Sequence, residues 1–335
     1  MKDSFGREID YLRISVTDRC NLRCIYCMPG ACDAVGSQED ILGSDEIVLI
    51  AEAAAETGIR HIRLTGGEPL IREDIIDLVS RIRKISGIDS VGITTNGILL
   101  EEYSERLASA GAGNINVSLD TLDEERFARI TGIDENACKA GSIYDRYNPR
   151  KILDGIDTAL RNGLTVRINC VLTDINRDEW ADLCDLARDR EIDVRFIELM
   201  PIGAGAGLEG ISNRELAARI QERFGKMELQ DGKRGNGPAV YYSLPGFRGC
   251  IGFISAVCDK FCSHCNRIRL TAAGILKPCL CYASTIDLKK MINSGADREE
   301  LVNTIKNAIL DKPAAHCFET PEMISESEYM SRIGG

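Results

Sequence analysis

Residues 13–29 of the chain read RISVTDRCNLRCIYCMP. The stretch begins within LRISV (12–16), a run rich in β-branched residues that predicts a buried strand. Three cysteines follow it at Cys20, Cys24 and Cys27, with the spacing C-x-x-x-C-x-x-C. Parallel α/β folds build their active sites at the carboxyl ends of strands. The position of these thiols therefore indicates a functional site.

Five further runs of the same kind recur along the chain. They are IRLTGG (62–67), VGITTNG (91–97), INVSLD (115–120), VRINCVLT (166–173) and VRFIELMP (194–201). Helical segments lie between them, and one begins at Asn148-Pro149, where proline suits the first helical position. Six alternations of strand and helix predict an α/β fold with a parallel sheet. Periodicity alone fits both a six-unit partial barrel and a doubly wound open sheet.

Composition narrows the class of protein. The chain has 335 residues, 44% of them hydrophobic, and a net charge of −11, which argues against a general nucleic-acid or membrane binder. The opening residues MKDSFGREIDYLRI lack the layout of a signal peptide, so we expect a cytoplasmic protein. Disulfides do not persist there. Fourteen cysteines therefore suggest metal or iron–sulfur chemistry beside ordinary buried thiols.

Small and polar residues gather at the carboxyl ends of the other predicted strands. Gly66-Gly67-Glu68-Pro69 follows the second, Thr94 ends the third, Ser118 and Asp120 end the fourth, and Met200 ends the sixth. Because these ends share one rim of a parallel sheet, we expect the residues to meet around one site.

Three thiols are one fewer than a structural zinc site usually has. A [4Fe–4S] cluster held by three thiolates leaves one iron open, so the missing ligand indicates a cluster that binds a further molecule. A zinc knuckle or a group of buried thiols is the alternative. With GGEP after the second strand, the motif resembles the radical S-adenosylmethionine (SAM) superfamily, in which the open iron binds SAM.

A second group of thiols lies at Cys262, Cys265 and Cys279. A hairpin centred near Ala272–Ala273 would place Cys265 roughly opposite Cys279. Arg267 and Arg269 are two residues apart and so point to one face of their strand. Three ligands again imply an open iron. Cys258, Cys281 or His264 could instead supply a fourth ligand and close the cluster, and a zinc site is a further alternative.

Arginines occupy strand positions at Arg13, Arg63, Arg167 and Arg195. An unpaired buried cation is unfavourable, and arginine forks suit phosphate, so these side chains could neutralise a triphosphate. Each could equally form an internal ion pair with one of the 52 acidic residues. The phosphate-binding loop of ordinary GTPases is absent from the sequence.

Several stretches together closely resemble the GTP 3′,8-cyclases, the molybdenum cofactor biosynthesis protein A family. They are RISVTDRCNLRCIYCMP, IRLTGGEPLIR, TTNG, INVSLD, RFIELMPIG and CNRIRLTAAGILKPCL. The likeness covers nearly the whole chain and includes the terminal Gly334-Gly335. It implies a partial (β/α)6 TIM-type barrel over residues 1–225. An irregular C-terminal iron–sulfur module over 226–320 would close its opening, and 321–335 would form a tail that enters the active site.

The resemblance also implies a lyase reaction. The first cluster would cleave SAM to a 5′-deoxyadenosyl radical, which abstracts hydrogen from C3′ of GTP. The ribose radical would attack C8, giving 3′,8-cyclo-7,8-dihydro-GTP, while the second cluster's open iron binds the guanine. Implied partners are cyclic pyranopterin monophosphate synthase downstream and an electron donor such as flavodoxin or ferredoxin. A homodimer is left open, and no nucleic-acid or membrane partner is expected.

Residue roles follow from the same resemblance. Cys20, Cys24 and Cys27 would hold the first cluster, and Cys262, Cys265 and Cys279 the second. SAM would contact Tyr26, Gly66, Gly67, Glu68, Ser118 and Met200. GTP would contact Arg13, Arg63, Thr94, Arg167, Arg195, Arg267 and Arg269, the last two with catalytic roles. Arg167 stands where many relatives have lysine, which keeps the charge but changes the geometry.

Other features carry weaker signals. ENACKAGSIYDR (135–146) looks like an insertion in a connection. His61 and His316 stand apart from any motif, so we expect solvated or core roles for them. Two other functions remain in view, a radical SAM peptide-modifying enzyme with an auxiliary cluster and a non-catalytic iron–sulfur protein. GGEP and the arginines argue against the latter, because an electron carrier needs no site for SAM or a triphosphate.

Overall fold

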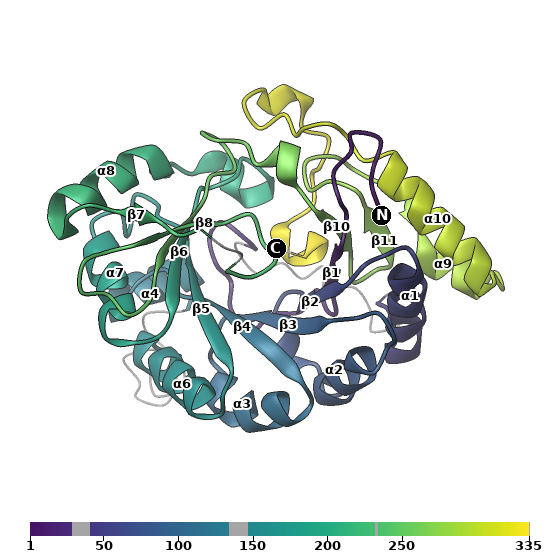
Figure 1. Cartoon of the computed structure of the whole chain (residues 1–335), viewed down its shortest axis with the longest axis horizontal. Coiled ribbons are helices and arrows are strands. Elements are labelled where there is room, and N and C mark those ends of the chain that lie inside the picture. Colours follow the sequence, from purple (N-terminus) through teal and green to yellow (C-terminus); the bar gives the residue numbers. More distant parts are fainter. Residues whose placement is uncertain (29–40, 134–146, 232–233, 335) are drawn as a thin grey trace.

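The computed structural model of the chain describes residues 1–28, 41–133, 147–231 and 234–334 (Figure 1). These residues form one sheet of twelve strands, in the order β12-β11-β10-β1-β2-β3-β4-β5-β6-β9-β8-β7. The sheet curls around a central space and carries helices on its outer side (Figure 1). The end strands of the described sheet, β12 and β7, do not pair with each other. The predicted α/β fold with a partial barrel is confirmed. The insertion at 135–146 lies outside the described residues.

The six strands predicted from sequence form the centre of the sheet, and all are parallel to their neighbours. They are β1 (Tyr11–Ser15), β2 (His61–Thr65), β3 (Ser90–Thr95), β4 (Ala112–Ser118), β5 (Thr165–Cys170) and β6 (Asp193–Ile197). Each ends before its β-branched run does, because the run continues into the loop at the carboxyl rim. The rim loops therefore begin with the small and polar residues noted in the sequence.

Helices connect these strands and cover the sheet. They are α1 (Ser44–Glu56), α2 (Ile75–Arg83), α3 (Leu100–Ser109), α4 (Glu124–Thr131), α6 (Pro149–Arg161), α7 (Trp180–Asp189) and α8 (Asn213–Phe224), followed later by α9 (Leu288–Asn293), α10 (Arg298–Leu310) and α11 (Met330–Ile333). The start predicted at Asn148-Pro149 is confirmed, since the Asn148 side chain accepts a hydrogen bond from the N–H of Lys151 at 2.8 Å. No helix in the described part of the chain is long and apolar enough to cross a membrane.

The later part of the chain adds strands to both edges of the six-stranded sheet. On one edge, β9 (Ile251–Ile254) lies parallel to β6, followed by β8 (Val240–Ser243) and β7 (Glu228–Leu229). On the other, β10 (Arg267–Leu270) lies parallel to β1, followed by β11 (Ile275–Lys277) and β12 (Ile286–Asp287). The parallel run therefore has eight strands, two more than the sequence predicted. The division into residues 1–225 and 226–320 stays a proposal.

The two faces of the sheet differ in polarity. Leu12 and Ile14 of β1 pack into the core with Ile47 and Ile50 of α1. Arg13, between them in sequence, points to the other face, because side chains alternate along a strand. Apolar burial under the helices thus holds the barrel together. It also leaves the inner face free to carry charged and polar groups.

Candidate active site

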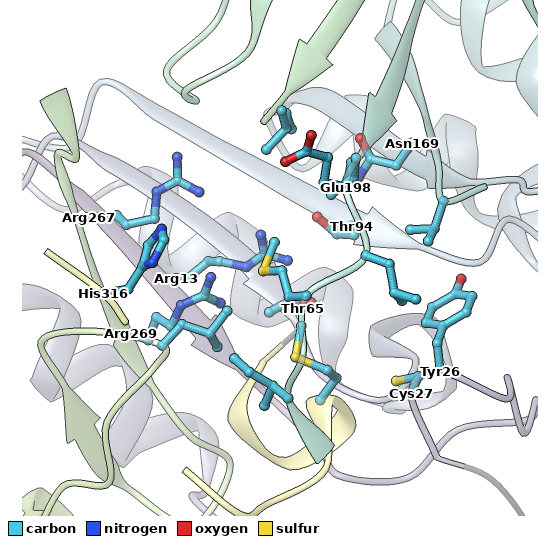
Figure 2. A pocket seen from close by; sticks show the side chains of 18 of the residues that line it. Arg13, Tyr26, Cys27, Thr65, Thr94, Asn169, Glu198, Arg267, Arg269 and His316 are labelled. Atoms are coloured by element: carbon cyan, nitrogen blue, oxygen red, sulfur yellow. The ribbon is translucent and has the colours of Figure 1, made fainter. Parts of the chain in front are cut away.

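A large cavity lies inside the curled sheet. It extends from the carboxyl ends of the central strands, next to Cys20 and Gly66, to the amino-terminal ends of β1 and β10, next to Cys262 and Cys265. Figure 2 shows Tyr26 and Cys27 on one side of it, and Arg267, Arg269 and His316 on the other. Most predicted site residues line it: Cys20, Cys24, Tyr26, Cys27, Gly66, Gly67, Ser118 and Met200, and also Arg13, Thr94, Cys262, Cys265, Arg267, Arg269 and Cys279. Glu68, Arg63, Arg167 and Arg195 were predicted as well but lie outside its lining.

The first three thiols are carried by the loop after β1, which α4 holds in place. Backbone N–H groups of Arg23 and Ile25 donate to carbonyl oxygens in the last turn of α4, at 2.8 and 2.9 Å. The N–H of Leu22 donates to Cys20 Sγ at 3.4 Å. These bonds fix the loop, and all three cysteines still line the cavity.

The two glycines of GGEP are required by the close approach of this loop. A Cβ atom on Gly67 would lie 2.1 Å from the carbonyl oxygen of Arg19, and one on Gly66 would lie 2.4 Å from that of Thr17. Gly66 also has a φ of +154°, which disfavours other residues. The family resemblance implied that Gly66 and Gly67 contact SAM. The structure adds that they let the cysteine loop pack onto the end of β2.

The first thiols are chemically suited to an iron–sulfur cluster. Burial raises the pKa of Cys20 to about 11, an effect to which Glu68 adds, and burial raises the pKa of Cys27 to about 12. A bound metal centre would supply the positive charge that deprotonates them. Within the described residues, no three His, Cys, Asp or Glu side chains converge as one metal ion requires. Three soft donors facing one cavity fit a cluster, whose irons each take a different thiolate.

Glu68 supports the cysteine loop from behind. Its carboxylate is fully buried and accepts hydrogen bonds from the Thr95 hydroxyl (2.7 Å) and from the N–H groups of Leu70 (2.9 Å) and Asn96 (2.7 Å). Burial raises the pKa of Glu68 to about 7. The Asn96 amide in turn donates to Asn21 Oδ1, in the loop, at 2.7 Å. Glu68 thus orders the loop through Asn96, and its predicted contact with SAM stays a prediction.

Tyr26 is oriented by a carboxylate at the end of β4. Its hydroxyl donates to Asp120 Oδ2 at 2.5 Å, and Asp120 Oδ1 accepts from the N–H of Val171 at 2.8 Å. Burial raises the pKa of Asp120 to about 6. The sequence marked Asp120 only as a strand end, because nothing local links it to a tyrosine 94 residues away.

The second three thiols lie near one another, at the amino-terminal end of β10 and the carboxyl end of β11. Cys262 and Cys265 precede β10, and Cys279 follows β11. Lys312 Nζ donates to the backbone carbonyls of Arg267 at 2.9 Å and of Pro278, next to Cys279, at 2.5 Å. Burial opposes ionisation of Cys265, but nearby Lys312 and Arg267 outweigh it and lower the pKa of this thiol. Cations thus surround the second set, while Glu68 and Asp120 lie near the first.

Arg7, which no motif marked, braces the same region. It forms a buried ion pair with Asp3 at 2.6 Å. Its other nitrogens donate to the carbonyl oxygens of Cys262 (2.9 Å) and Pro313 (2.7 Å). The N-terminus thereby ties the second cysteine segment to the segment that leads to His316.

The β10–β11 hairpin lies where the sequence predicted it. It pairs Arg269 with Lys277 and Leu270 with Leu276, so the turn is centred on Ala273. Continued outward, this register places Arg267 opposite Cys279, and Cys265 lies two residues beyond the position predicted roughly opposite it.

None of the three candidates for a fourth ligand lines the cavity. Cys281 is fully buried, and its Sγ lies 3.2 Å from that of Cys317. The N–H of Cys258 donates to Glu198 at 2.9 Å. His264 is exposed. These positions leave Cys262, Cys265 and Cys279 as the thiols that face the cavity on this side.

His316 corrects a further expectation. The sequence assigned it no part in a site, yet it lines the cavity beside the second thiols (Figure 2). Its backbone N–H donates to Cys262 Sγ at 3.4 Å. Burial and the nearby Lys260 lower the pKa of His316, so the ring is neutral at pH 7. Only the fold brings it to a thiol 54 residues away, and no local pattern could have revealed this.

Arginines lie side by side on the inner face of three neighbouring strands. In the sheet register, Arg13 of β1 is paired with Arg269 of β10 on one side and Arg63 of β2 on the other. Burial and the neighbouring Arg269 lower the pKa of Arg13, and burial and Arg267 lower that of Arg269 to about 10. The pKa shifts show that like charges crowd together here, which favours a bound anion.

The arginines that lie outside the cavity lining are held by protein groups. Arg63 donates to the carbonyl oxygen of Ile93 at 2.9 Å and to the Asn114 side chain. Arg167 forms an ion pair with Asp193 at 3.4 Å. Arg195 is buried as well. Burial lowers its pKa, and the neighbouring Arg63 and Arg167 add to this effect. Their contact with GTP stays a prediction.

The C-terminal tail reaches the centre of the barrel (Figure 1). The carbonyl oxygen of Gly334 accepts a hydrogen bond from Arg269 at 2.6 Å. The Ser331 hydroxyl lies 3.4 Å from Met28 Sδ, next to the first thiols, and Met330 lines the cavity. The segment around α11 therefore contacts the cysteine loop through Ser331 and β10 through Gly334.

Two family models match the chain. The model of the radical SAM superfamily matches residues 14–187, and the model described as Molybdenum Cofactor Synthesis C matches residues 192–318. Among solved structures, Streptococcus suis SuiB bound to S-adenosylmethionine has a TM-score of 0.61 at 16% identity, covering 96% of this chain and 76% of SuiB. Native anSMEcpe with bound AdoMet has a TM-score of 0.56 at 16% identity, covering 92% and 82%. At this identity the likeness shows the fold alone.

Curated relatives are much more similar. The chain is 46% identical to a protein named GTP 3′,8-cyclase from Clostridium perfringens (strain 13 / Type A), over all of both chains. It is 42% and 43% identical to the proteins of that name from Desulforamulus reducens and Moorella thermoacetica, again over all of both chains. With the thiols, the arginines and the tail placed as described, this full-length identity shows that the chain belongs to the GTP 3′,8-cyclase family of the radical SAM superfamily.

Proposed function

We propose that the protein is a radical SAM lyase that converts GTP to (8S)-3′,8-cyclo-7,8-dihydroguanosine 5′-triphosphate, the first step of molybdenum cofactor biosynthesis. Family membership supports this reaction. The structural observation that carries it is the presence of two three-thiol sets on one cavity whose inner wall is rich in arginine. We assign two [4Fe–4S] clusters and SAM as cofactors.

The first site prepares the radical. When bound at Cys20, Cys24 and Cys27, a cluster with SAM supplies the 5′-deoxyadenosyl radical that removes hydrogen from C3′ of the ribose. The protein's part is to hold SAM in one orientation. Tyr26, fixed by Asp120, and Ser118 and Met200 at the rim would bound SAM.

The second site and the arginines position the substrate. Arg13, Thr94, Arg267 and Arg269 line the cavity and would contact GTP directly. Crowded guanidinium groups favour a triphosphate, which neutralises them and relieves their mutual repulsion. Cys262, Cys265 and Cys279 would hold a second cluster, which with three thiolates would have one iron free to bind the guanine. Both ends of the nucleotide are then held, which sets C3′ toward the first site.

The remaining assignments rest on the family. The product would pass to cyclic pyranopterin monophosphate synthase, and flavodoxin or ferredoxin would supply electrons. We place the protein in the cytoplasm, as a monomer or homodimer, with no nucleic-acid or membrane partner.

One reaction tests the proposed function. The protein is reconstituted anaerobically with iron and sulfide, then given SAM, dithionite and either GTP or ATP, and the nucleotides are analysed by mass spectrometry. An isomer of GTP formed together with 5′-deoxyadenosine, and not formed from ATP, is the expected result. Release of 5′-deoxyadenosine with GTP unchanged would refute the substrate and favour a peptide-modifying enzyme. An absence of 5′-deoxyadenosine from fully reconstituted protein would favour a non-catalytic iron–sulfur protein.

Tyr11 offers a separate test of anion binding. Burial alone would raise its pKa, but Arg63 and Arg13 outweigh burial and lower it to about 8 from an ordinary value of 10.0. Its ionisation therefore favours the folded state, an effect that is complete above pH 10 and lost as the pH falls through 8. Inorganic triphosphate should neutralise the arginines and move the pKa of Tyr11 upward. The measurement is the ultraviolet absorbance of tyrosinate against pH, as a difference between wild type and Tyr11→Phe. An unchanged midpoint would mean that the anion binds elsewhere.

A further inference from the structure

Nε2 of His316 is a polar atom on the cavity wall to which the proposed reaction assigns no role. The side chain is only 8% exposed and lines the cavity with Arg267 and Arg269. Figure 2 shows the ring near these two side chains. Nε2 is buried and makes no hydrogen bond of good geometry within the described structure, although the backbone of Ala256 lies close enough to the ring to favour its protonated form slightly. A buried polar atom without a partner destabilises the fold, so its retention on a cavity wall points to a ligand.

The direction and chemistry of this atom are set by its neighbours. The N–H of Phe318 donates to Nδ1 of His316 at 3.4 Å, so Nδ1 is the acceptor and the N–H of the ring lies at Nε2. The ring stacks on that of Phe318, with 4.1 Å between centroids and 23° between planes. The contact of its own backbone with Cys262 fixes the distance to the second thiols. His316 therefore presents a single, oriented hydrogen-bond donor.

The surroundings of His316 suit a planar ring better than a phosphate. Phe261 and Phe318 both line this part of the cavity. The Arg267 guanidinium lies 5.5 Å from the centroid of Phe261. Aromatic rings and guanidinium planes bind nucleobases by stacking. An N–H donor at this position distinguishes nucleobases by the chemical group that each presents at the edge facing the donor.

We propose that His316 is a specificity-determining residue whose Nε2–H donates to O6 of the guanine. This inference rests on the proposed function, since it takes a guanine nucleotide as the ligand. Guanine has a carbonyl oxygen at position 6, whereas adenine has an amino group, itself a donor. Two donors facing each other would leave both unpaired, which is how a polar site rejects a near-identical ligand. His316 would thus select GTP over ATP without contacting the reacting atoms.

Binding without turnover tests the proposal. Reconstituted protein is dialysed anaerobically against GTP, ITP or ATP, with no SAM and no reductant. ITP keeps O6 and lacks only the 2-amino group. His316→Phe, which keeps a ring to stack on Phe318 but has no donor, should bind GTP and ITP about tenfold or more weakly, with ATP affinity unchanged. His316→Gln retains an N–H donor and should recover most of the loss. His264→Gln, an exposed neighbour, is the matched control and should behave as wild type.

Each other outcome has a distinct meaning. An equal loss of affinity for GTP and ATP would overturn the proposal, because His316 would then contact the part that the two nucleotides share. A lower iron content in both His316→Phe and His316→Gln would also overturn it, by making the histidine part of the cluster site. Failure of the proposed function looks different, since the wild-type protein itself would then bind GTP no better than ATP.

Discussion

Replacing Cys279 with alanine is expected to remove about half of the iron from the reconstituted protein and to abolish cyclisation of GTP. Cys279 faces the cavity beside Cys262 and Cys265, and a four-iron cluster cannot be held firmly by two thiolates. The first site should survive, so 5′-deoxyadenosine should still form when SAM and dithionite are added. Iron and sulfide analysis, electron paramagnetic resonance and product analysis of the same sample make the test.

Cys281→Ala is the matched control, two residues away. Its thiol is buried against that of Cys317 and lies outside the cavity lining, so iron content and activity should match those of wild type. The only expected effect is a packing loss of about 1 kcal/mol in unfolding free energy. If Cys281→Ala loses iron as Cys279→Ala does, the second cluster is closed by a fourth thiolate, and the open position assigned to it is wrong.

Gly67→Ala is expected to lower the rate of SAM cleavage at least about 100-fold. The new Cβ would lie 2.1 Å from the carbonyl oxygen of Arg19, which is backbone and cannot turn aside. The loop must then shift just before Cys20, and displacement of a site by about 1 Å can reduce a rate about 100-fold. The first cluster should be lost or become labile, while Cys262, Cys265 and Cys279 keep theirs. The readouts are 5′-deoxyadenosine formation and iron content.

Gly237→Ala provides the comparison for that variant. A Cβ at Gly237 would meet no atom within 4 Å, so activity and iron content should stay at wild-type values. Gly67→Ala protein with full iron content and a wild-type rate of SAM cleavage would contradict the account of the GGEP glycines as packing positions for the cysteine loop.

Much of this architecture could be predicted because its signals are local. A β-branched run marks each central strand, and a parallel sheet brings the carboxyl ends of its strands to one rim. Cys20, Gly66, Ser118 and Met200 were therefore expected to meet, and all four line the cavity. β10 was predicted as one arm of a hairpin, but its parallel place beside β1 was not, and β9 was missed because it is only four residues long and lies among loops.

The remaining differences between prediction and structure concern how deep a side chain lies in the barrel and which residues distant in sequence it contacts. Alternation along a strand tells which face a side chain takes, but not how far down the barrel it lies. Arg63 and Arg167 thus point inward as expected and yet are held by Asn114 and Asp193 outside the cavity lining. His316 could not be found for another reason. Its neighbour at the site, Cys262, is 54 residues away along the chain.

The position of α11 has a consequence for how the enzyme is made. Protein synthesis runs from the N-terminus, and the earlier parts of a chain fold first. The residues that join the cysteine loop to β10, Ser331 and Gly334, follow all the described strands in the chain. The barrel strands β1 to β6 can thus form while the cavity still lacks its final wall. Synthesis therefore supplies this part of the cavity wall after the sheet on which it packs.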